Sequence, residues 1–142
     1  MSAISLSPET EAMGLNERRK IKELQDTTFP ERVKEIEEIC GKAIPYEVDW
    51  ESLADDAQGL NFIDNLSCHR LNMALRTICT DDMGKAAVRD GIQLIKLKNV
   101  KYKGAMAMTF DKGVLEMHCA YALGTDGMFG DREIQALLVK KL

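Results

Sequence analysis

The central part of the chain, residues 60–78, is apolar around most of a helical surface. Its apolar residues recur at nearly every helical phase: Leu60, Phe62, Ile63, Leu66, Leu71, Met73, Leu75 and Ile78. The polar residues between them form one line: Asn61, Asn65, His69, Asn72 and Arg76. On a helix with about 3.6 residues per turn, these polar positions stack within about a quarter of the circumference. Because a helix that is apolar over most of its girth is usually buried, the pattern predicts a central helix that carries a single polar line.

Further helix signals lie on either side of this segment. Thr28 begins a capping-box pattern and Gly41 follows the last apolar position, which predicts a helix between them. Asp81 or Asp82 can cap a short helix, and Asp131 can cap a final one. Helices are therefore expected before, between and after the strand segments.

Four segments carry the patterns of β-strands. Residues 44–50 alternate apolar and polar positions, and Pro45 favours an edge position or a strand start there. Residues 92–100 are rich in Ile, Leu and Val, whereas residues 105–110 and 114–122 alternate strictly. The last three of these segments follow one another without a helix between them.

The last two segments are expected to form a hairpin whose loop length follows from side-chain parity. Each has one apolar face: Met106, Met108 and Phe110 on the first, and Leu115, Met117, Cys119 and Tyr121 on the second. These faces lie on the same side of a sheet only if the loop has an even number of residues. The simplest solution is the loop Lys112-Gly113, which sets Phe110 opposite Leu115.

The order of helix, strand, helices, three strands and helix indicates the α+β class. We expect a two-layer sandwich in which an antiparallel sheet of three or four strands ends in a C-terminal β-meander and the helices pack on one face. The length of 142 residues fits one domain. Residues 1–14 are expected to be a flexible leader, and residues 15–142 a single α+β domain.

Composition and charge restrict the classes of function. The formal net charge is −4, so general nucleic-acid binding, which usually needs a basic surface, is not expected. The apolar runs are too short for a membrane-spanning helix, and no secretory signal pattern begins the chain. The four cysteines lie in apolar patterns, as reduced buried thiols do. We therefore expect a soluble, acidic, cytoplasmic protein.

The polar line of the central helix is the first candidate for chemistry. His69 could act as a base or a ligand, Arg76 could bind a carboxylate or phosphate, and Asn65 and Asn72 could orient a substrate. The simpler interpretation, which we prefer, is a solvated helix face or a set of caps for neighbouring backbone. If the line instead faces the sheet, two further residues complete a candidate ligand pocket: His118 and Tyr121.

Two Cys-His dipeptides, Cys68-His69 and His118-Cys119, hold residue types that bind zinc. Adjacent residues on a strand face opposite sides, and adjacent residues on a helix diverge by about 100°. Each dipeptide can therefore contribute only one ligand to a common site. Since Cys-x-x-Cys spacing and phosphate-loop motifs are also absent from the sequence, we expect no metal and no cofactor.

A lysine-rich segment that begins in the second strand segment, residues 92–100, is a further candidate. It contains four lysines and one aromatic residue: Lys96, Lys98, Lys101, Lys103 and Tyr102. Such a segment could follow a phosphate backbone. Lysine on the solvent side of a sheet is, however, a common guard against unwanted strand pairing, and this explanation fits the acidic chain better.

Two hypotheses for the function remain from the sequence. The preferred one is a non-catalytic binding or accessory module whose partner is another protein or a second copy of the chain. Methionine-rich strands suit varied apolar partners, although core packing is their commoner use. The alternative is a small-molecule-binding protein or enzyme that uses a helix–sheet pocket lined by His69, Asn65, Asn72 and Arg76.

Overall fold

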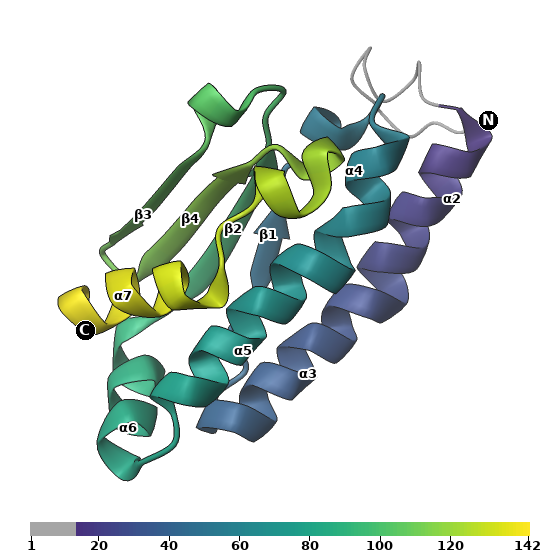
Figure 1. The fold of residues 1–142 in the computed structure, drawn as a ribbon. Coiled ribbons are helices and arrows are strands. Elements are labelled where there is room, and N and C mark those ends of the chain that lie inside the picture. Colours follow the sequence, from purple (N-terminus) through teal and green to yellow (C-terminus); the bar gives the residue numbers. More distant parts are fainter. Residues whose placement is uncertain (1–13) are drawn as a thin grey trace.

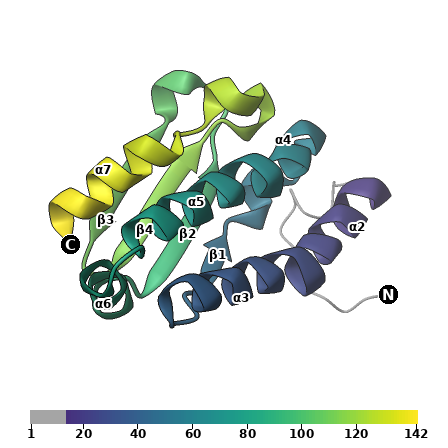
Figure 2. The same cartoon turned by 60° about the horizontal axis from the view of Figure 1, so that its bottom comes forward.

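Two long helical rods lie beside each other against one sheet in the computed structural model, which describes residues 14–142 (Figures 1 and 2). The first rod comprises α2 (Leu15–Glu23), a π-helical turn (Leu24–Thr28) and α3 (Phe29–Cys40). The second comprises α4 (Ala57–Phe62), a π-helical turn (Ile63–Cys68) and α5 (His69–Ile78). The expected central helix is therefore one continuous rod.

The other helices are shorter and lie around the sheet. They are α6 (Asp82–Gly91), α7 (Asp131–Lys141) and the 3₁₀ segments η2 (Trp50–Leu53), η4 (Lys103–Ala105) and η5 (Tyr121–Gly127). The four strands are β1 (Tyr46–Val48), β2 (Leu94–Asn99), β3 (Ala107–Asp111) and β4 (Val114–Cys119). Within residues 14–142, no helix has the length and apolar character needed to cross a membrane.

The expected antiparallel meander is wrong, because the sheet is mixed and its order is β1-β2-β4-β3. The pairs β1–β2 and β2–β4 are parallel, and only β3–β4 is antiparallel. Residues 100–106 carry the chain past the position of β4, so that β4 returns between β2 and β3. Burial explains this order, since β4 buries three of its side chains and β3 only one. The more apolar strand takes the inner position.

The hairpin itself is confirmed in loop length and register. Asp111 pairs with Val114 and Phe110 with Leu115, which leaves Lys112 and Gly113 as the loop. Both loop residues have positive φ, 52° for Lys112 and 81° for Gly113. This is the backbone conformation that tight two-residue hairpin turns require.

Helix ends agree with the sequence patterns in part. The Asp81 side chain accepts a hydrogen bond from the Gly84 N–H, and Gly41 ends α3 with a φ of 84°. Thr28, in contrast, has helical backbone angles and makes no side-chain cap, because α2 continues into α3 through the π-helical turn. The last helix has Gly130 rather than Asp131 at its N-cap. The expected leader, residues 1–14, lies outside the described residues except for Gly14.

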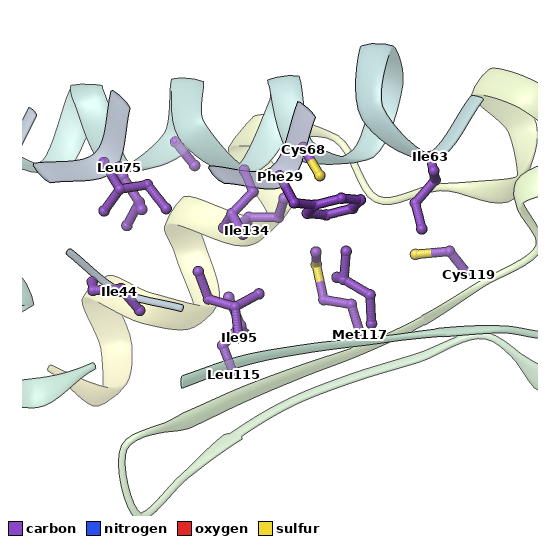
Figure 3. Packing of buried hydrophobic residues seen from close by; sticks show 14 of the residues in the cluster. Phe29, Ile44, Ile63, Cys68, Leu75, Ile95, Leu115, Met117, Cys119 and Ile134 are labelled. Carbon is purple, nitrogen blue, oxygen red and sulfur yellow. The ribbon is translucent and has the colours of Figure 1, made fainter. Parts of the chain in front are cut away.

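The core lies between the rods and one face of the sheet. Ile95, Leu115 and Met117 point from the strands toward Ile63 and Leu75 of the second rod (Figure 3). The strand residues between these positions are exposed or only partly buried. The sheet therefore has one apolar face against helices. Its other face carries charged and polar side chains, among them Lys96, Lys98 and Glu116.

Candidate functional site

The predicted polar line divides between solvent and the protein interior. Asn65, His69 and Arg76 are exposed, whereas Asn72 is buried with 3% of its surface accessible. On the helical wheel Asn72 lies about 60° from His69. That angle is enough to turn Asn72 toward α3, while Asn61, Asn65 and His69 are exposed. Arg76 is also exposed, but its Nη2 lies 3.8 Å from Glu35 Oε2 of α3.

Asn72 is the centre of a hydrogen-bonded network between the two rods and β1. Its Nδ2 donates to Glu35 Oε1 at 2.6 Å and to the Arg32 carbonyl at 3.2 Å, and its Oδ1 accepts from the Tyr46 hydroxyl at 2.7 Å. Arg32 donates to both carboxylate oxygens of Asp64, at 2.7 and 3.4 Å, and to Glu35 at 3.1 Å. The donors and acceptors of this network thus satisfy one another.

The surroundings of Arg32 and Glu35 stabilise the charged forms of both side chains. Burial disfavours the Arg32 cation, but hydrogen bonds and charge attraction from Asp64 and Glu35 more than offset it and raise the Arg32 pKa. Burial likewise disfavours the Glu35 carboxylate, yet donation from Asn72 and Arg32 lowers its pKa. Burial keeps the pKa of Tyr46 well above its usual range. At neutral pH Arg32 and Tyr46 are therefore protonated and Glu35 is ionised.

Four of the network residues were not found by sequence reasoning: Arg32, Glu35, Tyr46 and Asp64. Arg32 and Glu35 are three residues apart on one helix, a spacing that indicates a local ion pair. No local pattern relates either of them to Asp64 or Tyr46, because those contacts exist only after the rods pack together.

His118 and Tyr121 lie on different sides of the sheet and do not join the polar line. The His118 Nε2 lies 2.6 Å from Glu116 Oε2 on the face away from the helices. Tyr121 is fully buried, and burial holds its pKa well above the usual range. Its hydroxyl has no hydrogen-bond partner among the described residues, although Ser67 and Cys119 lie near enough to influence its ionisation. Of the predicted pocket residues, Asn72 and Arg76 both reach the Glu35 carboxylate, where Arg76 Nη2 lies 3.8 Å from Glu35 Oε2. His118 and Tyr121 do not join them.

The cysteines are buried, protonated thiols. Burial raises the pKa of Cys119 to about 11 and that of Cys79 to about 12. Cys40 and Cys68 are shifted in the same direction for the same reason. A nucleophilic cysteine needs the opposite shift. Among residues 14–142, no group of three or more His, Cys, Asp or Glu side chains is arranged to hold a metal ion.

The carboxyl ends of the parallel strands are occupied by the protein itself. In open α/β sheets this is the usual position of a ligand. Here Asn99 at the end of β2 donates to Asp56 Oδ2 and to the Ser52 carbonyl, both at 2.9 Å, and accepts from the Tyr121 N–H at 3.2 Å. Asp56 also caps α4 through the Gly59 N–H at 2.8 Å. This buried network fastens η2 and η5 over the strand ends.

The face of the sheet away from the core carries a row of alternating charges. Register places Glu47, Lys96, Glu116 and Thr109 side by side across all four strands. Lys96 Nζ lies 3.6 Å from Glu47 Oε2. In the next row Lys98 lies beside His118, and His118 beside Ala107. We call these residues the charged sheet face.

Among the described residues, hollows border the sheet at two places. One, of about 370 Å³, lies on the charged sheet face between Glu47, Lys96, Lys98 and Glu116. The other, of about 430 Å³, lies at the β3–β4 loop and is bordered by Asp90, Asp111, Lys112 and Lys141. Neither is lined by the predicted residues Asn65, His69, Asn72, Arg76, His118 or Tyr121.

Comparison of the chain with protein-family models, with curated proteins and with solved structures gives no match.

Proposed function

We propose that this protein is a non-catalytic binding module, and that its charged sheet face binds another protein. The proposal takes the fold as a two-layer sandwich whose helices cover one face of the sheet and leave the other open. The observation that supports it most directly is the row Glu47–Lys96–Glu116, which is ordered by strand register and lies outside the core.

The chemistry of the row suits a protein surface. Neighbouring strands are about 4.8 Å apart, so the charges alternate at a fixed spacing across the sheet. Exposed ion pairs of this kind contribute little to stability, about 0–1 kcal/mol each. Arranged charges do, however, select and orient partners with complementary charge. A structural role in stability alone is thus a weak explanation for this pattern.

Other classes of ligand fit this face less well. Acidic side chains interrupt the lysines, and the strands present no exposed aromatic side chain for base stacking, so nucleic acid is disfavoured. The hollow on this face is partly open and bordered mainly by charged groups, whereas small-molecule sites are usually enclosed and mostly apolar. The protonated thiols and the satisfied Arg32–Asp64 pair also offer little to catalysis.

The test disrupts the charge pattern of the charged sheet face without changing the net charge. Glu47→Lys combined with Lys98→Glu exchanges two exposed charges on the sheet face. The matched control, Lys34→Glu combined with Glu38→Lys, makes the same exchange on the exposed side of α3. The full chain would serve as bait in cell extract, followed by chemical cross-linking and mass spectrometry.

We expect the bait to retain a specific protein, the sheet-face variant to retain it at least tenfold less, and the control to behave like the wild type. Circular dichroism would establish that both variants are folded. Equal retention by the two variants, or no specific protein on the wild type, would refute the function proposed for this face.

A further inference from the structure

The β3 edge of the sheet presents a self-complementary backbone pattern. We infer that it pairs with β3 of a second copy of this chain, in antiparallel register about Thr109, so that two sheets form one continuous sheet. This pairing is independent of the protein partner proposed above, since it uses the edge of the sheet and not its charged face.

Register identifies the backbone groups that β3 leaves unpaired. A two-residue hairpin closes on a hydrogen-bonded pair, here Asp111 and Val114, and hydrogen-bonded pairs then alternate along the ladder. Thr109 and Ala107 therefore bond to β4, while the N–H and C=O groups of Met108 and Phe110 point to the open edge. These four groups have no hydrogen-bond partner among the described residues. Figure 1 shows β3 as the outermost strand.

The two edges of the sheet differ in their protection. Sheets commonly guard their edges with proline, lysine, short strands or bulges. At the other edge, β1 has only three residues and follows Pro45. The β3 sequence Ala-Met-Thr-Phe-Asp has five residues and contains neither proline nor lysine. It is thus the less protected edge, and a second strand would satisfy its free groups.

A two-fold axis at Thr109 satisfies all four groups at once. It places Met108 opposite Phe110 of the second copy, and each such pair exchanges two hydrogen bonds. An axis at Met108 would need the N–H of Met106, which already donates to the Lys103 carbonyl. An axis at Phe110 would need Lys112, which lies in the turn with a φ of 52°. The chain therefore favours one register over its neighbours.

Side chains are compatible with this register on both faces. On the core side, Met108 is only partly buried and would pack against Phe110 of the second copy, a favourable sulfur–aromatic contact. On the open side, Thr109 would meet Thr109, which is a favourable cross-strand pair. Asp111 would face Ala107 of the second copy, beyond which lie His118 and Lys98 in the same row. Asp111 of one copy would thus lie in the same row as Lys98 of the other.

The helix layer can contribute to the same interface. Helix α7 contacts β3, and it runs to this edge of the sheet in Figure 1. Its exposed side includes Ala136 and Val139, and 64% of the Val139 surface is accessible. A second copy related by the two-fold axis would bring its own α7 to the same edge, where these apolar groups could be covered.

The experiment uses cysteine cross-linking to read the register. Thr109→Cys would place two thiols in a pair that is not hydrogen-bonded, with Cα atoms about 4.5 Å apart, a separation that a disulfide can span. Ala107→Cys is the matched control, because it lies on the same exposed face but would face Asp111 rather than itself. The four native cysteines are buried, so the added thiol is the accessible one. Oxidised glutathione would serve as the oxidant, and non-reducing electrophoresis as the readout.

We expect Thr109→Cys to form covalent dimers at least tenfold faster than Ala107→Cys. A mixture of Ala107→Cys and Asp111→Cys chains should form the mixed dimer. Light scattering of the unmodified full chain should give a mass that rises with concentration toward twice 15.9 kDa. Met108→Pro, which removes one outward N–H but no bond to β4, should lower dimerisation relative to Met108→Ala. Equal cross-linking of both single-cysteine variants, or a wild-type mass that stays monomeric, would overturn the proposed pairing.

Discussion

Asn65 and Asn72 are identical side chains on one helical rod, but they have different physical roles. Asn65 is exposed, whereas Asn72 is buried; its Nδ2 donates to Glu35 and Arg32, and its Oδ1 accepts from Tyr46. A buried polar group is costly unless it is paired, and removal of one partner leaves the others unsatisfied. The stability of the network therefore depends on Asn72 in a way that composition alone does not reveal.

Asn72→Ala is expected to lower the free energy of unfolding by about 2–3 kcal/mol, because it leaves the Tyr46 hydroxyl without its acceptor and Glu35 with one donor fewer. Asn65→Ala should change it by no more than about 0.5 kcal/mol. Urea denaturation followed by circular dichroism measures both values. If the two variants had the same stability, the buried network would contribute nothing measurable.

In the β3–β4 hairpin and the connection before it, the need for a glycine likewise depends on its position. Gly113 has a φ of 81°, and a Cβ added there would lie 2.8 Å from Gln93 Cγ and 3.3 Å from the Gly91 carbonyl oxygen. Gly104, in the connection before β3, has no heavy atom within 4 Å of an added Cβ. Backbone conformation and nearby atoms, rather than the residue type, decide which glycine is required.

Gly113→Ala is expected to lower the free energy of unfolding by about 1–3 kcal/mol, since a side chain is strained at this φ and the Gln93 contact adds to the cost. Gly104→Ala should stay within about 0.5 kcal/mol of the wild type. Thermal and urea denaturation of both variants would test this. A Gly113→Ala protein as stable as the Gly104→Ala protein would contradict the turn geometry.

At the scale of the whole molecule, the buried thiols make the free energy of unfolding depend on pH. A group whose pKa is higher in the folded state stabilises the protein fully below its unfolded pKa, and this contribution is lost as the pH rises through the folded value. For Cys119 the unfolded pKa is about 8.5, and the folded pKa is raised to about 11. Stability should therefore decline between these two pH values.

Cys119→Ala should make this alkaline decline less steep by up to about 1.4 kcal/mol per pH unit. Without the thiol, the folded and unfolded states no longer differ in the proton that they bind at position 119. Met117→Ala, a buried control on the same strand face, should lower stability without changing the slope. Urea denaturation at intervals from pH 8 to pH 11 gives both slopes. Identical slopes in Cys119→Ala and Met117→Ala would show that Cys119 does not ionise on unfolding.

Local sequence patterns correctly predicted the features that depend on interactions between neighbouring residues. The continuous apolar rod, the caps at Gly41 and Asp81 and the two-residue loop at Lys112-Gly113 all depend on neighbouring residues, and all are present in the structure. The cap expected at Thr28 is not formed, because Thr28 has helical backbone angles and the preceding helix continues into α3 through a π-helical turn.

The candidate site depended more on contacts between distant parts of the chain. The spacing of the polar line identified Asn72 as a residue that needs hydrogen-bond partners, but its partners come from α3 and β1. The charged sheet face was visible in the sequence only as lysines at Lys96 and Lys98. Register with Glu47 and Glu116 turned these lysines into a row of alternating charge.

The sequence by itself determined where helices and strands form and which side chains share a face, because these follow from the 3.6- and 2-residue periods of the backbone. Strand order, the parallel pairs and the free β3 edge were decided only in the tertiary structure. Side-chain parity is the same for a meander and for the observed order, so it could not separate them. The burial of β4 between β2 and β3 did so, and it left Met108 and Phe110 with their backbone groups at the open edge.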